Sequence, residues 1–311
     1  MHLSLLLAQK IAVMFLMMFC GFMVVKLKVL QSSDSKILAK ICMYIVIPCM
    51  IIDAFQIECT QERLRDFLAM LAMSGLAHAV FIAGTMLLRK PLKLRRIEQL
   101  SLIYPNCGNL ILPLVASVFG DEMVFFATPY VCLQTIMVWT HGRAVICGGE
   151  GKFDPRKIFL NINVICTLLG LTLFITGTKL PSMLGDACDS LGGIIGPISM
   201  LLTGMLIGGA DLKKVFSHRH CYLISALRLA VYPVLLILAI RITGMAALTS
   251  TPAVPMITLL AASGPSATTI TNLAQVYNSD PEIAATVNII TMLLCIITMP
   301  LVNMFYQIVL L

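Results

Sequence analysis

Hydrophobic residues form long, uninterrupted stretches along the 311-residue chain. Most stretches are close to the roughly 20 apolar residues that a helix needs to cross a lipid bilayer. They do not alternate with polar residues, as the strands of a membrane barrel would. Clusters of charged and turn-forming residues, such as residues 31–34 and 217–220, separate them. The pattern predicts ten transmembrane helices, over residues 3–25, 37–57, 66–88, 99–119, 122–146, 158–178, 190–210, 221–244, 254–277 and 282–310.

Composition supports an all-α polytopic membrane protein. Hydrophobic residues make up 59% of the chain, charged residues 12%, and the mean hydropathy is +0.95. Ten spans leave only short connections, so no sizeable soluble domain fits. The first apolar stretch has no small-residue cleavage site and is expected to be a retained span, not a signal peptide.

The eleven cysteines do not indicate a metal centre. Most lie inside apolar stretches, where cysteine behaves as a small hydrophobic residue. None forms a C-x-x-C pair, and His218 and His220 lie in a basic loop where they are expected to be solvated. We therefore predict no metal and no resident cofactor.

Positive charge predicts the orientation of the spans. One set of loops carries sixteen Lys and Arg residues, whereas the alternate set carries five. Because basic residues near helix ends are retained on the cytoplasmic side, both termini are predicted to face outward across the cell membrane. This asymmetry also accounts for the net charge of +7, so the charge gives no reason to expect a nucleic-acid partner.

A weak internal repeat divides the chain into two halves. Residues 115–121 (VASVFGD) resemble residues 273–278 (LAQVYN), which Asp280 follows shortly, at an offset of 158. A unit of five spans begins on one side of the membrane and ends on the other, so a second copy is inserted upside down. We predict inverted five-helix repeats over residues 1–149 and 158–311, joined by a cytoplasmic linker at 150–157, an arrangement typical of secondary transporters.

Spans four and nine each carry an interruption at the expected mid-membrane depth. Residues 104–113 contain two prolines, a glycine and two asparagines, and residues 263–272 are again rich in Gly, Pro and short polar side chains. Proline removes a backbone donor, so carbonyls near Asn109 and Ile111 are expected to lose their helical partners. In a bilayer, such groups must be satisfied by protein, ligand or water.

Two broken helices that meet at the midplane would turn helix N-termini toward one another, which favours an anion. The candidate ligands are neutral hydrogen-bonding residues suited to a carboxylate, together with one proline. The alternative interpretation is a pair of kinked helices that pack through small residues, but the matching positions in both halves favour a site. The candidates are Asn106, Asn109, Pro113, Ser266, Thr268, Thr269, Thr271 and Asn272.

Ionisable residues within the spans are few. Arg228 lies about two turns inside span eight, where it could support the site, although snorkelling to the headgroups is the preferred interpretation. His78 in span three is the other candidate for a charge or proton site. The spans contain no deeply placed carboxylate pair, which argues against a cation substrate.

Several short motifs resemble the auxin efflux carrier family and its bacterial relatives. They are YIVIPCM over 44–50, the pair Pro105 and Asn106, LPLV over 112–115, FGD over 119–121 and LAQVYN over 273–278 with Pro281 and Glu282. The resemblance implies ten helices in two inverted repeats, with spans four and nine crossing at an organic-anion site. It also implies that Asn106 contacts the substrate carboxylate and that Pro113 is the crossover proline.

The chain departs from the plant members of that family in two ways. It has Ile270 where they carry a second crossover proline, and its central loop is reduced to about a dozen residues. It is therefore more similar to the compact bacterial members, which include malate and malonate carriers, than to the plant auxin exporters.

We therefore predict a secondary transporter of a small organic anion, working by alternating access and without enzymatic activity. No nucleotide-binding motif is present to supply energy. Uniport and symport with H⁺ or Na⁺ remain open, as do the identity of the carboxylate, the direction of transport and a homodimeric state. The rival interpretations are a sodium-coupled anion symporter of the bile-acid type and a membrane sensor that binds without transporting.

Overall fold

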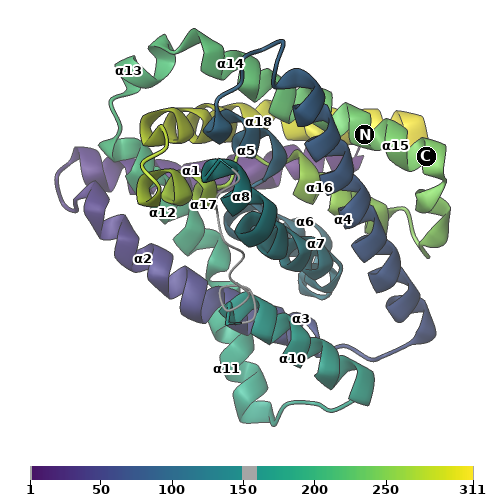
Figure 1. Ribbon diagram of the computed structural model, residues 1–311. Helices are drawn as coiled ribbons and strands as arrows, with labels where there is room; N and C mark the ends of the chain where they lie inside the picture. Colours follow the sequence, from purple (N-terminus) through teal and green to yellow (C-terminus); the bar gives the residue numbers. More distant parts are fainter. Residues whose placement is uncertain (1, 149–159, 311) are drawn as a thin grey trace.

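The computed structural model of the chain describes residues 2–148 and 160–310. Most of these residues are helical, and one isolated bridge joins two short extended segments among them. Figure 1 shows a bundle in which α1 begins and α18 ends on the same side.

Seven helical stretches among the described residues are long and apolar enough to cross a membrane, and three more are apolar but shorter. The long stretches lie within α1 (His2–Lys26), η1 to α3 (Ser32–Ala54), α4 (Gln61–Leu88), η4 to α8 (Asp121–Ile146), α11 to α12 (Ser182–Gly209), α14 to α15 (Arg219–Thr243) and α18 (Pro281–Leu310). The shorter ones are η3 to α6 (Cys107–Phe119), α10 (Ile162–Thr176) and α16 (Ala253–Ser263).

Several of these stretches consist of joined segments. The first is η1 (Ser32–Asp34), α2 (Ser35–Ile41), η2 (Cys42–Val46) and α3 (Ile47–Ala54). The next are η3 (Cys107–Ile111) with α6 (Leu112–Phe119), and η4 (Asp121–Met123), α7 (Val124–Met137), η5 (Val138–Gly142) and α8 (Arg143–Ile146). The later ones are α11 (Ser182–Gly193) with α12 (Ile195–Gly209), and α14 (Arg219–Ala226), η6 (Leu227–Val231) and α15 (Tyr232–Thr243). The other helices are α5 (Arg96–Ile103), α13 (Leu212–Ser217), η7 (Met245–Leu248) and α17 (Thr268–Val276).

The helices begin and end within about five residues of the predicted positions, except at the start of the seventh span. The seventh span starts at Ser182, eight residues before the predicted residue 190, because the polar segment that holds Asp186 and Asp189 is helical too. The second covers Ser32–Ala54 instead of residues 37–57. The third starts at Gln61 instead of residue 66, because the Thr60 hydroxyl accepts a hydrogen bond from the Arg63 amide and caps α4. The predicted linker at 150–157 lies outside the described residues.

Three prolines inside helices are each preceded by a wide π-helical turn. The turns η2, η3 and η6 end two residues before Pro48, Pro113 and Pro233 respectively. Because proline has no amide hydrogen and its ring collides with the preceding turn, a wider turn accommodates it without ending the helix. At Pro48 the helix continues in this way, whereas α11 and α12 meet at Ile194, shortly before Pro197.

The closest helix packing joins α1 to α12 through glycine. A Cβ atom added at Gly204 would lie 1.9 Å from the Met18 carbonyl oxygen, and one added at Gly21 would lie 2.2 Å from that of Leu201. No larger residue fits while the helices keep this separation. Small residues let helix backbones approach in a membrane, where no hydrophobic force between helices replaces that packing.

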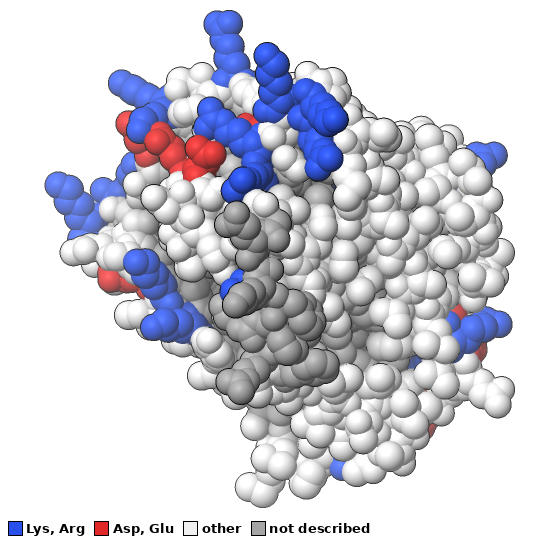
Figure 2. All heavy atoms as spheres, in the orientation of Figure 1, with Lys and Arg blue, Asp and Glu red and all other residues white. Residues whose placement is uncertain are grey.

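The helices form two groups that pack mainly within themselves. One group contains α1, α2, α3, α10, α11 and α12, and the other contains α4, α5, α7 and α14 to α18. The second group encloses the interrupted segments described below. Lys and Arg side chains gather at the end of the molecule where α13 and the start of α14 lie, beside a broad uncharged surface (Figure 2). This separation agrees with the uneven distribution of basic loops along the sequence.

Candidate functional site

The fourth predicted span is interrupted between Ile103 and Cys107. Helix α5 ends at Ile103, and Tyr104 takes an extended conformation with φ −105° and ψ 112°. A residue that precedes proline is pushed out of the helical region, and Pro105 therefore accounts for this break. The helix resumes with the π turn η3 and continues through Pro113. The gap thus lies at residues 104–106, whereas we expected the carbonyls near Asn109 and Ile111 to lose their partners.

The ninth predicted span is interrupted in the same manner. Helix α16 ends at Ser263, and α17 begins at Thr268 after the extended residues Gly264 and Ala267. The two helices that end here, α5 and α16, have last residues 160 positions apart in the sequence, slightly more than the offset of 158 inferred from the C-terminal motifs.

The two gaps pair with each other through their backbones. The Asn106 amide donates to the Pro265 carbonyl at 2.8 Å, and the Ala267 amide donates to the Tyr104 carbonyl at 3.0 Å. Together they form an antiparallel bridge centred on Pro105 and Ser266. We call residues 104–106 and 264–267 the junction. Each segment thus supplies the hydrogen bonds that the other lost from its helix, as burial in a membrane protein requires.

Side chains from two further helices bind other backbone groups of the junction. Gln134 on α7 donates from Nε2 to the Pro105 carbonyl at 2.8 Å. On α18, Asn288 donates from Nδ2 to the Ser266 carbonyl at 2.5 Å, and the Thr291 hydroxyl accepts from the Ser266 amide at 3.0 Å. Sequence reasoning missed all three residues. A polar residue in an apolar span was the only available signal, and it does not identify the carbonyl that is bound.

Arg228 is wholly buried and binds the ends of both interrupted helices. Its guanidinium donates to the carbonyls of Leu102 at 2.9 Å, Ala262 at 2.6 Å and Gly264 at 3.2 Å. Its side chain has 0% exposed surface, so the preferred interpretation that it snorkels to the headgroups was wrong. The α5 and α16 C-termini concentrate partial negative charge at these carbonyls, and a fixed cation with a planar fork of donors neutralises it.

The predicted ligands are distributed over the junction and the two helices that leave it. Asn106 and Ser266 are buried, and Asn106 Nδ2 donates to the Thr268 hydroxyl at 3.2 Å. The hydroxyl oxygens of Ser266 and Thr271 are buried and have no hydrogen-bond partner among the described residues. The candidates further along the helices are Asn109, which is half-buried, Thr269 and Asn272, which are exposed on α17, and Pro113, which is buried on α6.

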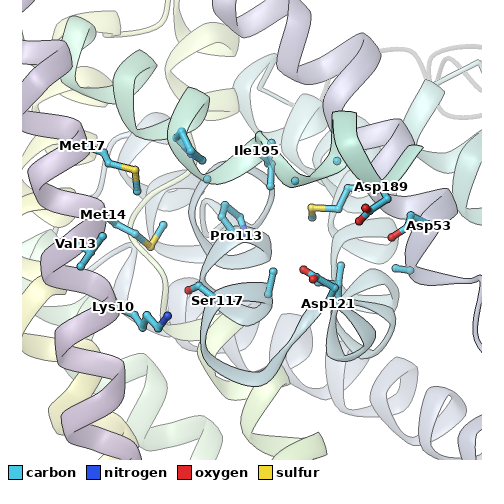
Figure 3. Close-up of a pocket in the computed structure, with 18 residues that line it drawn as sticks. Lys10, Val13, Met14, Met17, Asp53, Pro113, Ser117, Asp121, Asp189 and Ile195 are labelled. Carbon is cyan, nitrogen blue, oxygen red and sulfur yellow. The ribbon is translucent and has the colours of Figure 1, made fainter. Parts of the chain in front are cut away.

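A pocket of about 390 Å³ opens beside α6, between that helix, α1, α3 and the α11–α12 bend. Of the predicted site residues, only Pro113 lines it. Figure 3 shows the Asp53, Asp121 and Asp189 carboxylates on one side of Pro113 and the Lys10 ammonium on the other. Three acids against one base give the pocket a net negative charge, which repels an anion. The pocket is therefore not itself suited to hold a carboxylate.

Comparison with known proteins identifies the family. A model of the family described as membrane transport protein matches residues 6–156 and 150–303, which together cover nearly the whole chain. The chain belongs to this family. It is the family of the auxin efflux carriers, as the motifs in spans two, four and nine indicated. This membrane transport protein is accordingly a multi-pass membrane protein of a transporter family. No curated protein matches the chain in sequence.

Proposed function

We propose that this membrane transport protein carries a small organic anion and binds its carboxylate where the two interrupted helices meet. The observation that carries the proposal is the junction, at which the helices beginning at Cys107 and Thr268 both start. The first turn of a helix has backbone amides without helical partners and a partial positive charge, so two such starts side by side favour a negative ligand.

The side chains at the junction suit a carboxylate. Asn106 and Thr268 already contact each other there. The hydroxyl of Ser266, which has no hydrogen-bond partner in the described part of the chain, lies in the same segment. All three are neutral groups that can donate hydrogen bonds. A carboxylate accepts several such bonds at once, and neutral donors bind it without a second buried charge. We assign the central contacts to these residues, with Asn109 and Thr271 beside them.

A polar face of α17 provides an approach to the junction. Thr269, Asn272 and Gln275 are exposed on this helix, whereas Ile270 and Leu273 are buried on its other side. An exposed polar stripe is costly against lipid tails, so within a membrane it is expected to face water. We therefore place a water-filled route to the site along this face of α17.

The transport movement follows from the two groups of helices. We propose that the group with the junction rocks against the group formed by α1, α2, α3 and α10 to α12, as in other carriers built from inverted repeats. In this scheme, ten spans form two inverted repeats of five, and both termini face outward. Arg228 holds the junction together during the movement and does not contact the substrate.

Reconstitution tests the proposal. Purified protein in liposomes, loaded with unlabelled malonate or malate, is expected to take up the same labelled anion by counterflow. Asn106→Ala and Thr268→Val each remove a proposed contact, and each is expected to slow uptake at least about tenfold, as the loss of one charge-assisted hydrogen bond of about 1.5–3 kcal/mol implies.

Thr172→Val is the matched control, because Thr172 is exposed on α10, away from the junction. Thermal unfolding verifies that each variant is folded. If both junction variants transport as fast as the control, the site assignment is wrong. If the wild type binds these anions without exchanging them, the chain acts as a sensor instead. Replacing Na⁺ by K⁺ distinguishes the sodium-coupled alternative, since only that mechanism loses uptake.

A further inference from the structure

An apolar groove runs along α1 toward the end of the bundle where basic side chains gather. It has a volume of about 290 Å³, and every residue that lines it is apolar. Its walls come from α1, α12, α13 and α18, and they include Phe15, Phe19, Phe22, Ile207, Leu212 and Leu293. Phe19 is 56% exposed, and α1 is one of the helices long enough to cross a membrane. The groove therefore opens on the surface that faces lipid.

Two lysines lie at one end of this groove. The Lys26 ammonium lies over the Phe22 ring, 5.4 Å from its centroid. Lys213 directly follows Leu212, the α13 residue in the groove wall. A Cβ atom added at Gly208 would lie 3.0 Å from the Phe22 carbonyl oxygen, so the end of α12 lies beside the end of α1. Both lysines are thus at the end of the molecule where Figure 2 shows Lys and Arg side chains gathered around α13.

The charge at this end of the groove is positive. Lys26 and Lys213 are exposed, and neither forms an ion pair within the part of the chain that the structure describes. The neighbouring acids have other partners. Asp211 caps α13 by accepting from the Lys213 and Lys214 amides at 3.1 and 3.4 Å. Glu282 pairs with the Lys214 ammonium at 2.6 Å. Three ammonium groups against two carboxylates leave a net positive charge.

An apolar groove with a positive end matches the chemistry of a phospholipid, which joins acyl chains to a phosphate headgroup. The surrounding bilayer is as apolar as the groove, so an acyl chain gains only packing there and little hydrophobic energy. Lysines near a membrane surface, by contrast, attract anionic headgroups. The headgroup charge therefore decides which lipid is held, and an anionic lipid is favoured over a zwitterionic one.

We propose that this groove binds one anionic phospholipid, with an acyl chain along α1 and the headgroup phosphate at Lys26 and Lys213. The binding does not depend on the transported anion, because none of the junction residues lines the groove. The walls belong to both groups of helices, since α1 and α12 lie in one group and Leu293 lies on α18 of the other. A lipid seated here bridges the two groups and stabilises the folded protein by mass action.

Thermal unfolding of the delipidated protein in detergent measures the binding. Dioleoyl-phosphatidylglycerol is expected to raise the unfolding midpoint clearly more than dioleoyl-phosphatidylcholine, which has the same chains and no net charge. Glycerol phosphate has the headgroup charge without the chains, and it is expected to have no effect. Lys26→Gln and Lys213→Gln should each weaken phosphatidylglycerol binding about fivefold, which is the contribution of one lysine near a membrane surface. Lys90→Gln, an equal change at an exposed lysine after α4, is the matched control.

A second pair of variants tests the apolar part of the groove. Leu293→Trp fills the groove, whereas Leu294→Trp changes the next residue, which is exposed and does not line it. Only Leu293→Trp is expected to lose the bound phosphatidylglycerol, which native mass spectrometry counts. If Leu293→Trp does not fold, the exposed lysine variants still decide.

Lipid binding in this groove is refuted by any of several results. They are equal stabilisation by phosphatidylcholine or by glycerol phosphate, Lys26→Gln and Lys213→Gln that bind phosphatidylglycerol as tightly as Lys90→Gln does, and a folded Leu293→Trp that retains the lipid. A native mass of two chains that Leu293→Trp reduces to one assigns the groove to a second copy of the protein and also refutes it. Absence of malonate counterflow counts against the proposed function alone and leaves the lipid site standing.

Discussion

Arg228 offers the sharpest test of how the junction is held together. Replacing it by Met removes three hydrogen bonds and leaves the carbonyls of Leu102, Ala262 and Gly264 buried without a donor. Each orphaned carbonyl costs about 1–3 kcal/mol. Removing a charge whose burial itself costs several kcal/mol offsets part of this loss. We expect the free energy of unfolding of Arg228→Met to fall by about 2–5 kcal/mol, within the range of large single-residue effects.

Two further variants give the measurement its meaning. Arg228→Lys keeps the charge but loses the planar fork of donors, so its stability should lie between those of the wild type and Arg228→Met. Arg241, at the far end of the same helical stretch, is exposed and binds a single carbonyl, that of Val309 at 2.9 Å. Arg241→Met is therefore the matched control and should have little effect.

Thermal and denaturant unfolding of the detergent-solubilised protein provide the assay. The Arg228 guanidinium also makes a cation–π contact with Phe81, at 5.2 Å from the ring centroid. Met cannot make this contact, so its loss does not change the expected order of stability, in which Arg228→Met is the least stable. The reasoning is refuted if Arg228→Met is as stable as the wild type, or if Arg241→Met loses as much stability as Arg228→Met does.

Three other outcomes are expected. Gly204→Ala should lower the stability of the protein strongly or push α1 away from α12. Gly185→Ala is the control, because its new Cβ meets nothing within 4 Å. Unfolding measurements compare the stability of the two variants, and cross-linking compares the distance between α1 and α12. Thr60→Ala should lower the free energy of unfolding by about 1 kcal/mol through loss of the α4 cap, measured by chemical denaturation. The hydrogen bond and charge of Glu282 raise the pKa of the exposed Lys214. Their pairing should therefore persist at neutral pH and be lost when alkaline pH deprotonates Lys214 or acid pH protonates Glu282. Because both groups are exposed, Lys214→Ala should leave thermal unfolding at neutral pH unchanged.

The sequence predicted the helices well because a membrane imposes length and apolarity on them. Both interruptions were predicted too, since Pro105 and the segment around Pro265 cannot continue a helix without loss. The sequence led us to expect that the two gaps lie close together, but not that their backbones form hydrogen bonds with each other. Hydrogen bonds between residues so far apart in the chain leave no local sequence pattern.

The supporting residues were harder to predict for a different reason. Gln134, Asn288 and Thr291 act on backbone atoms, and neither their spacing nor their type specifies which atom. Arg228 was misinterpreted because depth along a helix does not reveal the direction of its side chain. A long flexible side chain two turns from the surface can reach either headgroups or interior carbonyls, and only the packing of α5 and α16 decides between them.

The bridge between Tyr104, Asn106, Pro265 and Ala267 also has a consequence for biosynthesis. Residues 104–106 enter the membrane long before the ribosome has made residues 265–267. Until then their backbone groups must find temporary partners, in water or in the insertion machinery, because lipid offers none. Completion of the junction is thus a late event that depends on contacts of high sequence separation, which are slow to form. A nascent chain stalled before α16 would expose an unfinished polar gap, a feature by which quality control could recognise it.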